Sequence, residues 1–279
     1  MTAIITSFAR AAEKYQGFII DLWGVVHDGR QAFPPSVEAM ARMRALGKKV
    51  CLLSNAPSRT DFLRRHLDKL GVKEYDFLLS SGELVWREFK TRSSPQFASL
   101  GQKCHIIGAA AGLALLEGLD LIACPDLEEA DFVWCVQMPD QDYRPILEKM
   151  KKLDLPMVCG NPDMVVLYGD KMALCPGTMA AGYQKMGGRV IYRGKPYPEA
   201  YEACFALCAS RNLAAIGDGM VTDIAGARRA GLDAYFITGG IHRDELALNG
   251  RPAHDQSRLA EFLAQYPYVP TAAMTALVW

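Results

Sequence analysis

The sequence predicts an α/β protein with a parallel-sheet core, and three observations support this. Short apolar segments typical of strands alternate with amphipathic segments typical of helices. Several predicted strands are followed at once by segments rich in Asp, Ser, Asn and Gly, which is where parallel sheets place their ligands. The chain has 279 residues, half of them hydrophobic and 22% charged, which suits a soluble globular protein with one large core or two smaller ones.

The first alternating series extends to about Gly82. Its predicted helix has Val37, Met40, Met43 and Leu46 on one face, which is the spacing of an amphipathic helix. The expected elements are a strand at 18–21, a helix at 36–46, a strand at 49–53, a helix from about 58 that ends near Gly71, and a short strand at 78–79.

A second series interrupts the first and indicates an inserted domain. It comprises strands at 105–107, 121–124, 132–137 and 157–159, helices at 110–117 and 143–153, and a hairpin of 165–168 with 172–175 that turns at Gly169-Asp170. The first series then resumes with strands at 190–192, 214–216 and 234–237 and helices at 199–209 and 222–230. We therefore predict a core of residues 1–83 and 182–279 and an inserted α/β cap of residues 84–181.

Charge and cysteine content exclude several functional classes. Lys plus Arg and Asp plus Glu both number 31, so no net field attracts nucleic acid or an anionic membrane. Residues 1–10 do not form a signal peptide, and no apolar run is long enough for a membrane span. The eight cysteines form no Cys-x-x-Cys pair and lie mostly in apolar segments, which indicates buried reduced thiols and a cytoplasmic location.

Four polar segments follow predicted strands and carry the chemistry. Each of them alone is ordinary turn sequence. Together they are informative, because the carboxyl ends of parallel strands converge at one edge of a sheet. The segments are Asp21-Leu22-Trp23-Gly24, Leu53-Ser54-Asn55, Gly194-Lys195-Pro196, and Gly217-Asp218-Gly219 with Asp223 nearby.

This set suits phosphoryl transfer. Asp21 can attack phosphorus and form an aspartyl-phosphate. A divalent cation would let a carboxylate approach a phosphate dianion, and Asp218 and Asp223 supply the oxygen ligands that Mg²⁺ prefers. Ser54 and the amides after it, starting with Asn55, can bind phosphoryl oxygens, while Lys195 can offset charge in the transition state.

The ordered motifs resemble the haloacid dehalogenase (HAD) superfamily, in the class whose large cap lies between the second and third motifs. The branch it resembles contains NagD-like sugar- and nucleotide-phosphate phosphatases and 4-nitrophenylphosphatase-like proteins. The resemblance implies a HAD-like Rossmannoid core. It makes Asp21 the nucleophile, Ser54 and Lys195 the phosphate ligands, and Asp21, Asp218, Asp223 and the Trp23 backbone carbonyl the Mg²⁺ ligands. In the cap, Gly160-Asn161-Pro162-Asp163 and Pro176-Gly177-Thr178 resemble family signatures near the substrate.

Trp23 departs from the family pattern. Phosphatases of the family carry Asp at this position, where it protonates the leaving oxygen and then activates water, whereas an indole has no group that titrates near neutral pH. His27 or Asp28 are candidates to replace that acid. An aromatic residue here also resembles the true dehalogenases, but the acidic pair and the position of the cap argue against dehalogenation.

The sequence thus predicts an Mg²⁺-dependent phosphatase of small phosphorylated metabolites, of the sugar phosphate or nucleotide class, slowed by the loss of its usual acid. The alternative is a phosphometabolite-binding protein with little or no turnover. Neither nucleic acid nor a membrane is expected as a partner, and a homodimer formed through the cap is left open.

Overall fold

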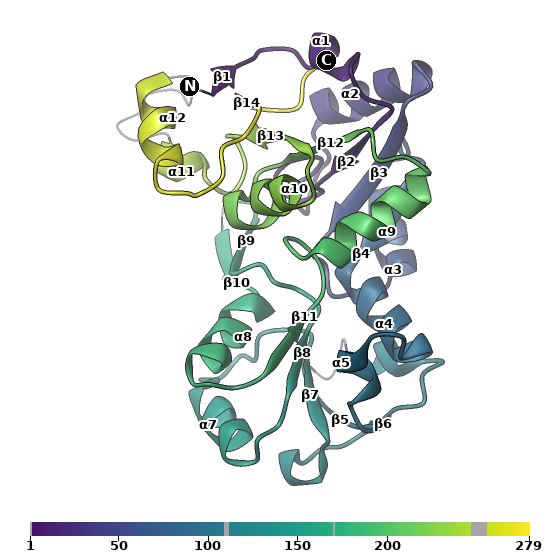
Figure 1. Cartoon of the computed structure of the whole chain (residues 1–279), viewed down its shortest axis with the longest axis vertical. Coiled ribbons are helices and arrows are strands. Elements are labelled where there is room, and N and C mark those ends of the chain that lie inside the picture. Colours follow the sequence, from purple (N-terminus) through teal and green to yellow (C-terminus); the bar gives the residue numbers. More distant parts are fainter. Residues whose placement is uncertain (1, 109–111, 170, 247–255) are drawn as a thin grey trace.

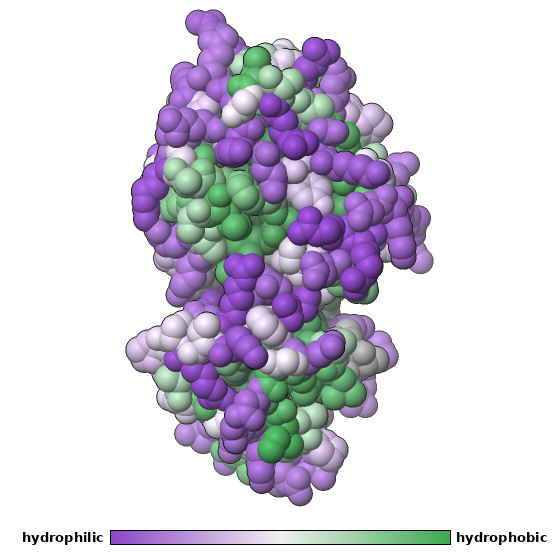
Figure 2. Space-filling view, turned by 90° about the vertical axis from the view of Figure 1, so that its right-hand side faces the viewer, coloured by the Kyte–Doolittle hydropathy of each residue, from purple (hydrophilic) through white to green (hydrophobic). Residues whose placement is uncertain are grey.

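The computed structural model describes residues 2–108, 112–169, 171–246 and 256–279. These residues form two lobes, each built on its own parallel sheet, and Figure 1 shows the larger sheet above the smaller one. The space-filling view in Figure 2 shows a constriction between the two lobes. Every helix among the described residues is too short or too polar to cross a lipid bilayer. The predicted α/β fold with a parallel-sheet core is confirmed.

The larger sheet has seven strands in the order β1-β14-β13-β12-β2-β3-β4, and all neighbours are parallel. Helices cover both faces, so the central strands are apolar throughout rather than alternating. The strands are β1 (Ala3–Ile4), β2 (Gly17–Ile20), β3 (Lys49–Ser54), β4 (Phe77–Ser80), β12 (Leu213–Gly217), β13 (Asp233–Ile237) and β14 (Ala272–Met274).

Successive residues of these strands enter opposite hydrophobic cores. Ile20 packs with residues of α2 (Pro34–Ala45) and α3 (Thr60–Lys69), whereas Ile19 packs with residues of α9 (Pro198–Cys208), α10 (Ala225–Arg229) and α12 (Gln256–Leu263). The short helices α1 (Ala9–Ala12) and α11 (Arg243–Leu246) complete the lobe. The core is therefore a three-layer sandwich, which fixes the strand ends at one edge.

The smaller sheet has five parallel strands in the order β11-β8-β7-β5-β6. The helices α4 (Ser81–Thr91) and α5 (Pro95–Ala98) pack on one face, and α7 (Arg144–Lys152) and α8 (Pro176–Lys185) pack on the other. The strands are β5 (Lys103–Ile107), β6 (Ile122–Ala123), β7 (Phe132–Cys135), β8 (Met157–Cys159) and β11 (Val190–Tyr192).

The predicted end of the cap at residue 181 is wrong. Residue 181 lies inside α8, and β11 pairs with β8 in the smaller sheet. The end of α8 and β11, both predicted in the core, therefore belong to the cap. The sequence misleads here because β11 ends just before Gly194-Lys195, a segment of the core site, which is typical of a core strand. Lys195 instead enters the core site from the segment that returns from the cap. At the other boundary, α4 begins at Ser81 and packs in the cap core.

Two further local predictions need correction. The expected helix at 110–117 is a single 3₁₀ turn, Leu113–Leu116, and residues 109–111 lie outside the described part of the chain. The expected helix at 222–230 begins with a π-helical turn, Met220–Ile224, before α10. A second 3₁₀ turn, Leu127–Glu129, links β6 to β7.

The predicted hairpin is present and reaches the core. Its strands β9 (Val165–Tyr168) and β10 (Lys171–Leu174) pair antiparallel, and Gly169 adopts a φ of 59° at the turn. The Gly169 amide donates to the Asp28 carbonyl oxygen at 3.2 Å, in the loop after β2. Figure 1 shows this hairpin between the two lobes, so a cap element touches the edge that carries the site.

Candidate active site

Asp21 lies at the carboxyl end of β2, in the middle of the larger sheet. Its backbone amide donates to the Ile216 carbonyl oxygen at 2.9 Å, which ties it to the neighbouring strand β12. The chain turns sharply at Gly24, where φ is 78° and a Cβ atom would lie 1.9 Å from an Asp218 carboxylate oxygen. Glycine is therefore required for this approach of the two strand ends.

Three buried carboxylates meet at this edge, as the sequence predicted. Asp218 follows β12 and Asp223 lies in the π-helical turn, and together with Asp21 they place ligand oxygens within 4.8 Å of one another. Backbone amides fix the two outer acids. The Ile241 amide donates to Asp218 at 2.8 Å, and the Gly219 amide donates to Asp223 at 3.0 Å.

Lys195 is the cation within this cluster. Its Nζ donates to Asp21 Oδ1 and, at 2.7 Å, to Asp223 Oδ1, and its side chain is 3% exposed. Burial alone would lower the pKa of Lys195, but the surrounding carboxylates of Asp21, Asp223 and Asp163 hold it above its usual range. Lys195 therefore carries a positive charge at the reacting edge.

The charges of the cluster do not balance. Burial raises the pKa of Asp21 to about 7 although Lys195 opposes the rise, and burial together with the neighbouring carboxylates raises the pKa of Asp218. One lysine against three acids leaves an excess of negative charge in a buried site. An all-oxygen donor set with surplus negative charge is what a hard divalent cation such as Mg²⁺ requires, so these residues fit it.

Ser54 is the last residue of β3 and Asn55 follows it, both beside this cluster, but their side chains have different roles. Ser54 lines the cavity, and its hydroxyl oxygen accepts from the Ala56 amide at 3.1 Å. The side chain of Asn55 is fully used. Its amide donates to Asp163 at 2.8 Å and to the Lys195 carbonyl oxygen at 3.0 Å, while its Oδ1 accepts from the Lys195 amide and from Ser81. Any phosphate contact by Asn55 would therefore come from its backbone.

Asn55 joins the core to the cap through the predicted Asn161–Asp163 segment. Burial raises the pKa of Asp163 to about 6, against the effects of Lys195 and of the Asn55 hydrogen bond. Gly177 does not line the cavity. A Cβ atom there would lie 2.3 Å from the Pro162 carbonyl oxygen, so Gly177 lets α8 pack against the backbone that presents Asp163. Ser81, which also holds Asn55, had no signal in the sequence.

A cavity of about 440 Å³ opens between the cluster and the cap. The predicted residues Asp21, Ser54, Asn161, Asp163, Lys195, Asp218 and Asp223 all line it. The sequence did not predict its other walls. They come from the hairpin and its flanking residues, from the π-helical turn after β12, from the loop after β13 and from the turn after α12: Met164, Val165, Val166, Leu167, Cys175, Val221, Ile241, His242 and Tyr266. The cluster and the cavity thus form one site between the lobes.

Trp23 lines this cavity and packs under the hairpin. Its ring lies 5.9 Å from the Tyr168 ring and 5.0 Å from the His27 ring, measured between centroids. Gly29, at a φ of 87°, leaves room for the indole, because a Cβ atom there would lie 2.4 Å from Trp23 Cη2. Arg30 lies over Tyr168 at 5.2 Å. The residue at the expected acid position therefore connects core and cap by aromatic packing.

Neither candidate for a replacement acid suits that role. His27 is fully buried, its Nδ1 accepts from the Gly29 amide at 3.0 Å, and burial lowers its pKa to about 4. Asp28 caps the turn, because its Oδ1 accepts from the amides of Arg30 and Gln31, each at 2.8 Å. Both residues shape the loop after β2 and neither lines the cavity.

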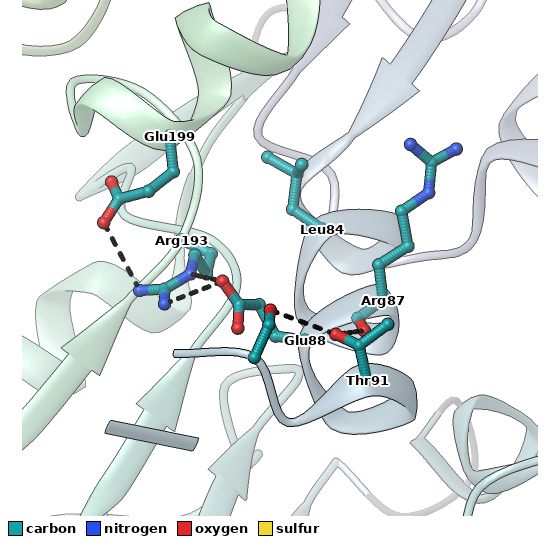
Figure 3. Close-up of a pocket in the computed structure, with 7 residues that line it drawn as sticks. Leu84, Arg87, Glu88, Thr91, Arg193 and Glu199 are labelled. Atoms are coloured by element: carbon teal, nitrogen blue, oxygen red, sulfur yellow. Dashed lines mark hydrogen bonds and ion pairs between the residues drawn. The ribbon is translucent and has the colours of Figure 1, made fainter. Parts of the chain in front are cut away.

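Arg193 anchors the segment that carries Lys195. Its guanidinium is 3% exposed, donates to Glu88 of α4 at 3.1 Å and lies 3.8 Å from Glu199 of α9. Figure 3 shows it between these two helices, beside a small cavity of about 150 Å³. Because α4 belongs to the cap and α9 to the core, Arg193 fixes the position where the chain crosses between the lobes.

Strand-end carboxylates, a lysine and an inserted cap define a hydrolase of the haloacid dehalogenase-like type, and comparison with known proteins places the chain in that family. The family model described as haloacid dehalogenase-like hydrolase matches residues 18–122, and a second, HAD-hydrolase-like model matches residues 192–264. A haloacid dehalogenase-like hydrolase from Brucella suis 1330 has 30% sequence identity and a TM-score of 0.82, over 98% of this chain and all of the other. The chain belongs to the haloacid dehalogenase-like hydrolase family.

More distant relatives agree with the NagD-like branch. The ribonucleotide monophosphatase NagD of Escherichia coli K12 is 23% identical over 227 residues, which are 80% of this chain and 87% of NagD. The fold also matches a possible sugar phosphatase of the HAD superfamily from Cytophaga hutchinsonii, with 20% identity, a TM-score of 0.79 and coverage of 99% and 98%. The chain therefore has the fold and family of these phosphatases.

Proposed function

We propose that this protein is an Mg²⁺-dependent phosphatase that hydrolyses small phosphate monoesters through an aspartyl-phosphate on Asp21. The observation that carries the proposal is the contact of Asp21 with Lys195 inside a cluster of three buried acids, open to a cavity between two lobes. Membership of a hydrolase family whose relatives include a nucleotide phosphatase supports it.

The bound cation would be held by Asp21, Asp218 and Asp223, with the Trp23 carbonyl as the further ligand that the family resemblance implies. When bound, Mg²⁺ supplies charge compensation that lets a carboxylate meet a phosphate dianion. Within the chain, Asp21 attacks phosphorus, and Lys195 neutralises charge on the phosphoryl oxygens. Ser54 and the amide of Asn55 hold the phosphoryl group in line.

The cap would select the organic part of the substrate. Asn161 and Asp163 line the cavity at the junction with the core, and Gly177 supports the backbone that carries them. Sugar phosphates and nucleotides, the classes expected from the sequence, are therefore the first esters to assay.

The test is phosphate release by purified protein with Mg²⁺ from a panel of sugar phosphates, nucleotides and nitrophenyl phosphate, with Asp21→Asn as the matched control. The amide cannot attack phosphorus but has the same shape, so turnover should fall at least about 100-fold while phosphate-ester binding persists. Phosphate release within tenfold of wild type would show that Asp21 is not the nucleophile. Binding without any turnover in the wild type would instead support the phosphometabolite-binding alternative, which Trp23 favours.

A further inference from the structure

The cavity wall that faces the acid cluster is apolar. The hairpin strand β9 and the residue before it contribute four apolar lining residues, and the π-helical turn after β12 and the loop after β13 add one each. These are Met164, Val165, Val166 and Leu167 from the cap and Val221 and Ile241 from the core. Among the described residues lining the cavity, Lys195 is the only lysine or arginine, and it is already paired with Asp21 and Asp223.

Most polar side chains on this wall already have partners. Asn161 Oδ1 accepts from the Asp163 amide at 3.1 Å, and the Thr222 hydroxyl lies 3.5 Å from Asp223 Oδ2. His242 Nε2 accepts from the Met220 amide at 3.5 Å. A polyhydroxyl group placed here would lose its water without gaining an equivalent set of hydrogen bonds, whereas an apolar ring would gain by burial.

Among the described residues that line the cavity, no acid stands at the position expected to protonate the leaving oxygen. Trp23 occupies the position of the acid, and His27 is fully buried against the Trp23 ring. Asp163 is the remaining carboxyl on the cap side. Its Oδ1 accepts from the Asn55 amide, and a pKa of about 6 leaves it mostly ionised above pH 7. Because Trp23 stands at the acid position and Asp163 already holds the Asn55 amide, a leaving group that departs as a stable anion suits this site best.

We propose that the site takes aryl phosphates, the phosphate monoesters of phenols, in preference to sugar phosphates. This rests on the proposed phosphatase function. A phenyl ring fits the apolar wall, and a phenolate is stable enough to leave without a proton, so one chemical class satisfies both independent features of the cavity.

The reaction balances without a protein acid. A carboxylate oxygen of Asp21 forms a bond to phosphorus while the bond from phosphorus to the phenolic oxygen breaks, and the phenolate leaves with the electron pair and takes a proton from water. A second water molecule then attacks phosphorus, the bond to Asp21 breaks, and inorganic phosphate leaves while Asp21 is again a carboxylate. The proton released by the attacking water neutralises the hydroxide left by protonation of the phenolate. The net change is ester plus water to phenol plus phosphate.

Three esters, assayed with Mg²⁺, test the apolar wall and the missing acid separately. Phenyl and benzyl phosphate are both apolar but differ in the acidity of the leaving alcohol, and kcat for phenyl phosphate should be higher by at least about 100-fold, the lower end of what acid catalysis supplies. Benzyl phosphate and ribose 5-phosphate both release alkoxides but differ in polarity, and kcat/KM should favour benzyl phosphate by at least about tenfold.

A matched pair of variants tests the wall itself. Leu167→Asn places an amide on the cavity and should raise KM for phenyl and benzyl phosphate at least about fivefold, with little change for ribose 5-phosphate. Leu174→Asn is the control, because Leu174 is 55% exposed on the adjacent strand and does not line the cavity. Calorimetric binding of inorganic phosphate with Mg²⁺ should be the same in both variants and shows that the phosphate end is intact.

The outcomes distinguish a failure of the aryl preference from a failure of the proposed phosphatase activity on which it rests. If none of the three esters nor nitrophenyl phosphate releases phosphate, the phosphatase proposal fails. If ribose 5-phosphate is hydrolysed as efficiently as phenyl phosphate, the enzyme stands but the aryl preference is wrong. If phenyl and benzyl phosphate have similar kcat values that Asp163→Asn pulls apart, Asp163 is the acid and the inference also fails.

Discussion

Replacing Trp23 with Asp should restore the acid that the site lacks and speed the hydrolysis of esters with poor leaving groups. Trp23 lines the cavity next to Asp21, so a carboxyl on the same backbone position faces the substrate. General acid catalysis is worth about 10²–10⁴-fold, and a shorter, newly introduced acid should recover at least about tenfold of this in kcat for benzyl or sugar phosphates. Nitrophenyl phosphate should gain little, because nitrophenolate departs without a proton.

The substitution also has a structural cost that the geometry allows to be estimated. The indole forms two aromatic contacts, with His27 and Tyr168, and such contacts contribute about 0.5–1.5 kcal/mol each. Trp23→Asp should therefore lower the free energy of unfolding by about 1–3 kcal/mol, a shift of a few degrees in Tm. Because Tyr168 belongs to the cap, part of this loss should appear as weaker packing of the cap hairpin on the core, and therefore as a higher KM.

Trp23→Phe is the matched control, since it keeps an aromatic ring and adds no carboxyl. The assay is steady-state phosphate release for one alkyl and one aryl ester, together with thermal melting of wild type and both variants. A Trp23→Asp protein that melts as a folded chain, binds Mg²⁺ and gains no rate on either ester would refute the reasoning. An equal gain in Trp23→Phe would show that the indole obstructs the cavity rather than replacing an acid.

Three more outcomes are expected. Asp218→Asn should weaken Mg²⁺ binding at least about tenfold, and calorimetry that finds equal affinity would remove Asp218 from the site. Burial lowers the pKa of His27 from 6.5 to about 4, so the unfolded chain takes up this proton first and stability is lost as the pH falls from 6.5 toward 4. His27→Asn, which keeps an acceptor for the Gly29 amide, should remove about 2–3 kcal/mol of that dependence, measured by denaturant titration at pH 7 and 4.5. Arg193→Met should destabilise the protein by about 3 kcal/mol, because it removes a buried guanidinium and leaves the partly buried Glu88 with only the Ser94 hydroxyl as a partner. Arg87→Met, at a half-exposed position, should change stability by less than about 1 kcal/mol, and equal effects of the two variants would mean that burial of the Arg193 pair is unimportant.

The sequence by itself determined the fold class and the residues of the acid cluster. Buried parallel strands must be apolar throughout, so β2, β3, β12 and β13 stand out from their surroundings. The polar residues after three of these strands converge because parallel strands end at one edge, and Asp21, Ser54 and Asp218 follow from that rule alone. The absence of an acid at Trp23 was equally visible, since it depends on residue type and not on geometry.

Only the tertiary structure decided how the cap completes the site. Three residues before Lys195, β11 ends, and local sequence cannot tell whether such a strand pairs with β8 of the cap or with the core sheet. The use of Asn55 as a bridge to Asp163 depends on a hydrogen bond between positions 108 residues apart. The burial of His27 beneath Trp23 and the apolar wall of the hairpin likewise arise from long-range packing, which no local pattern records.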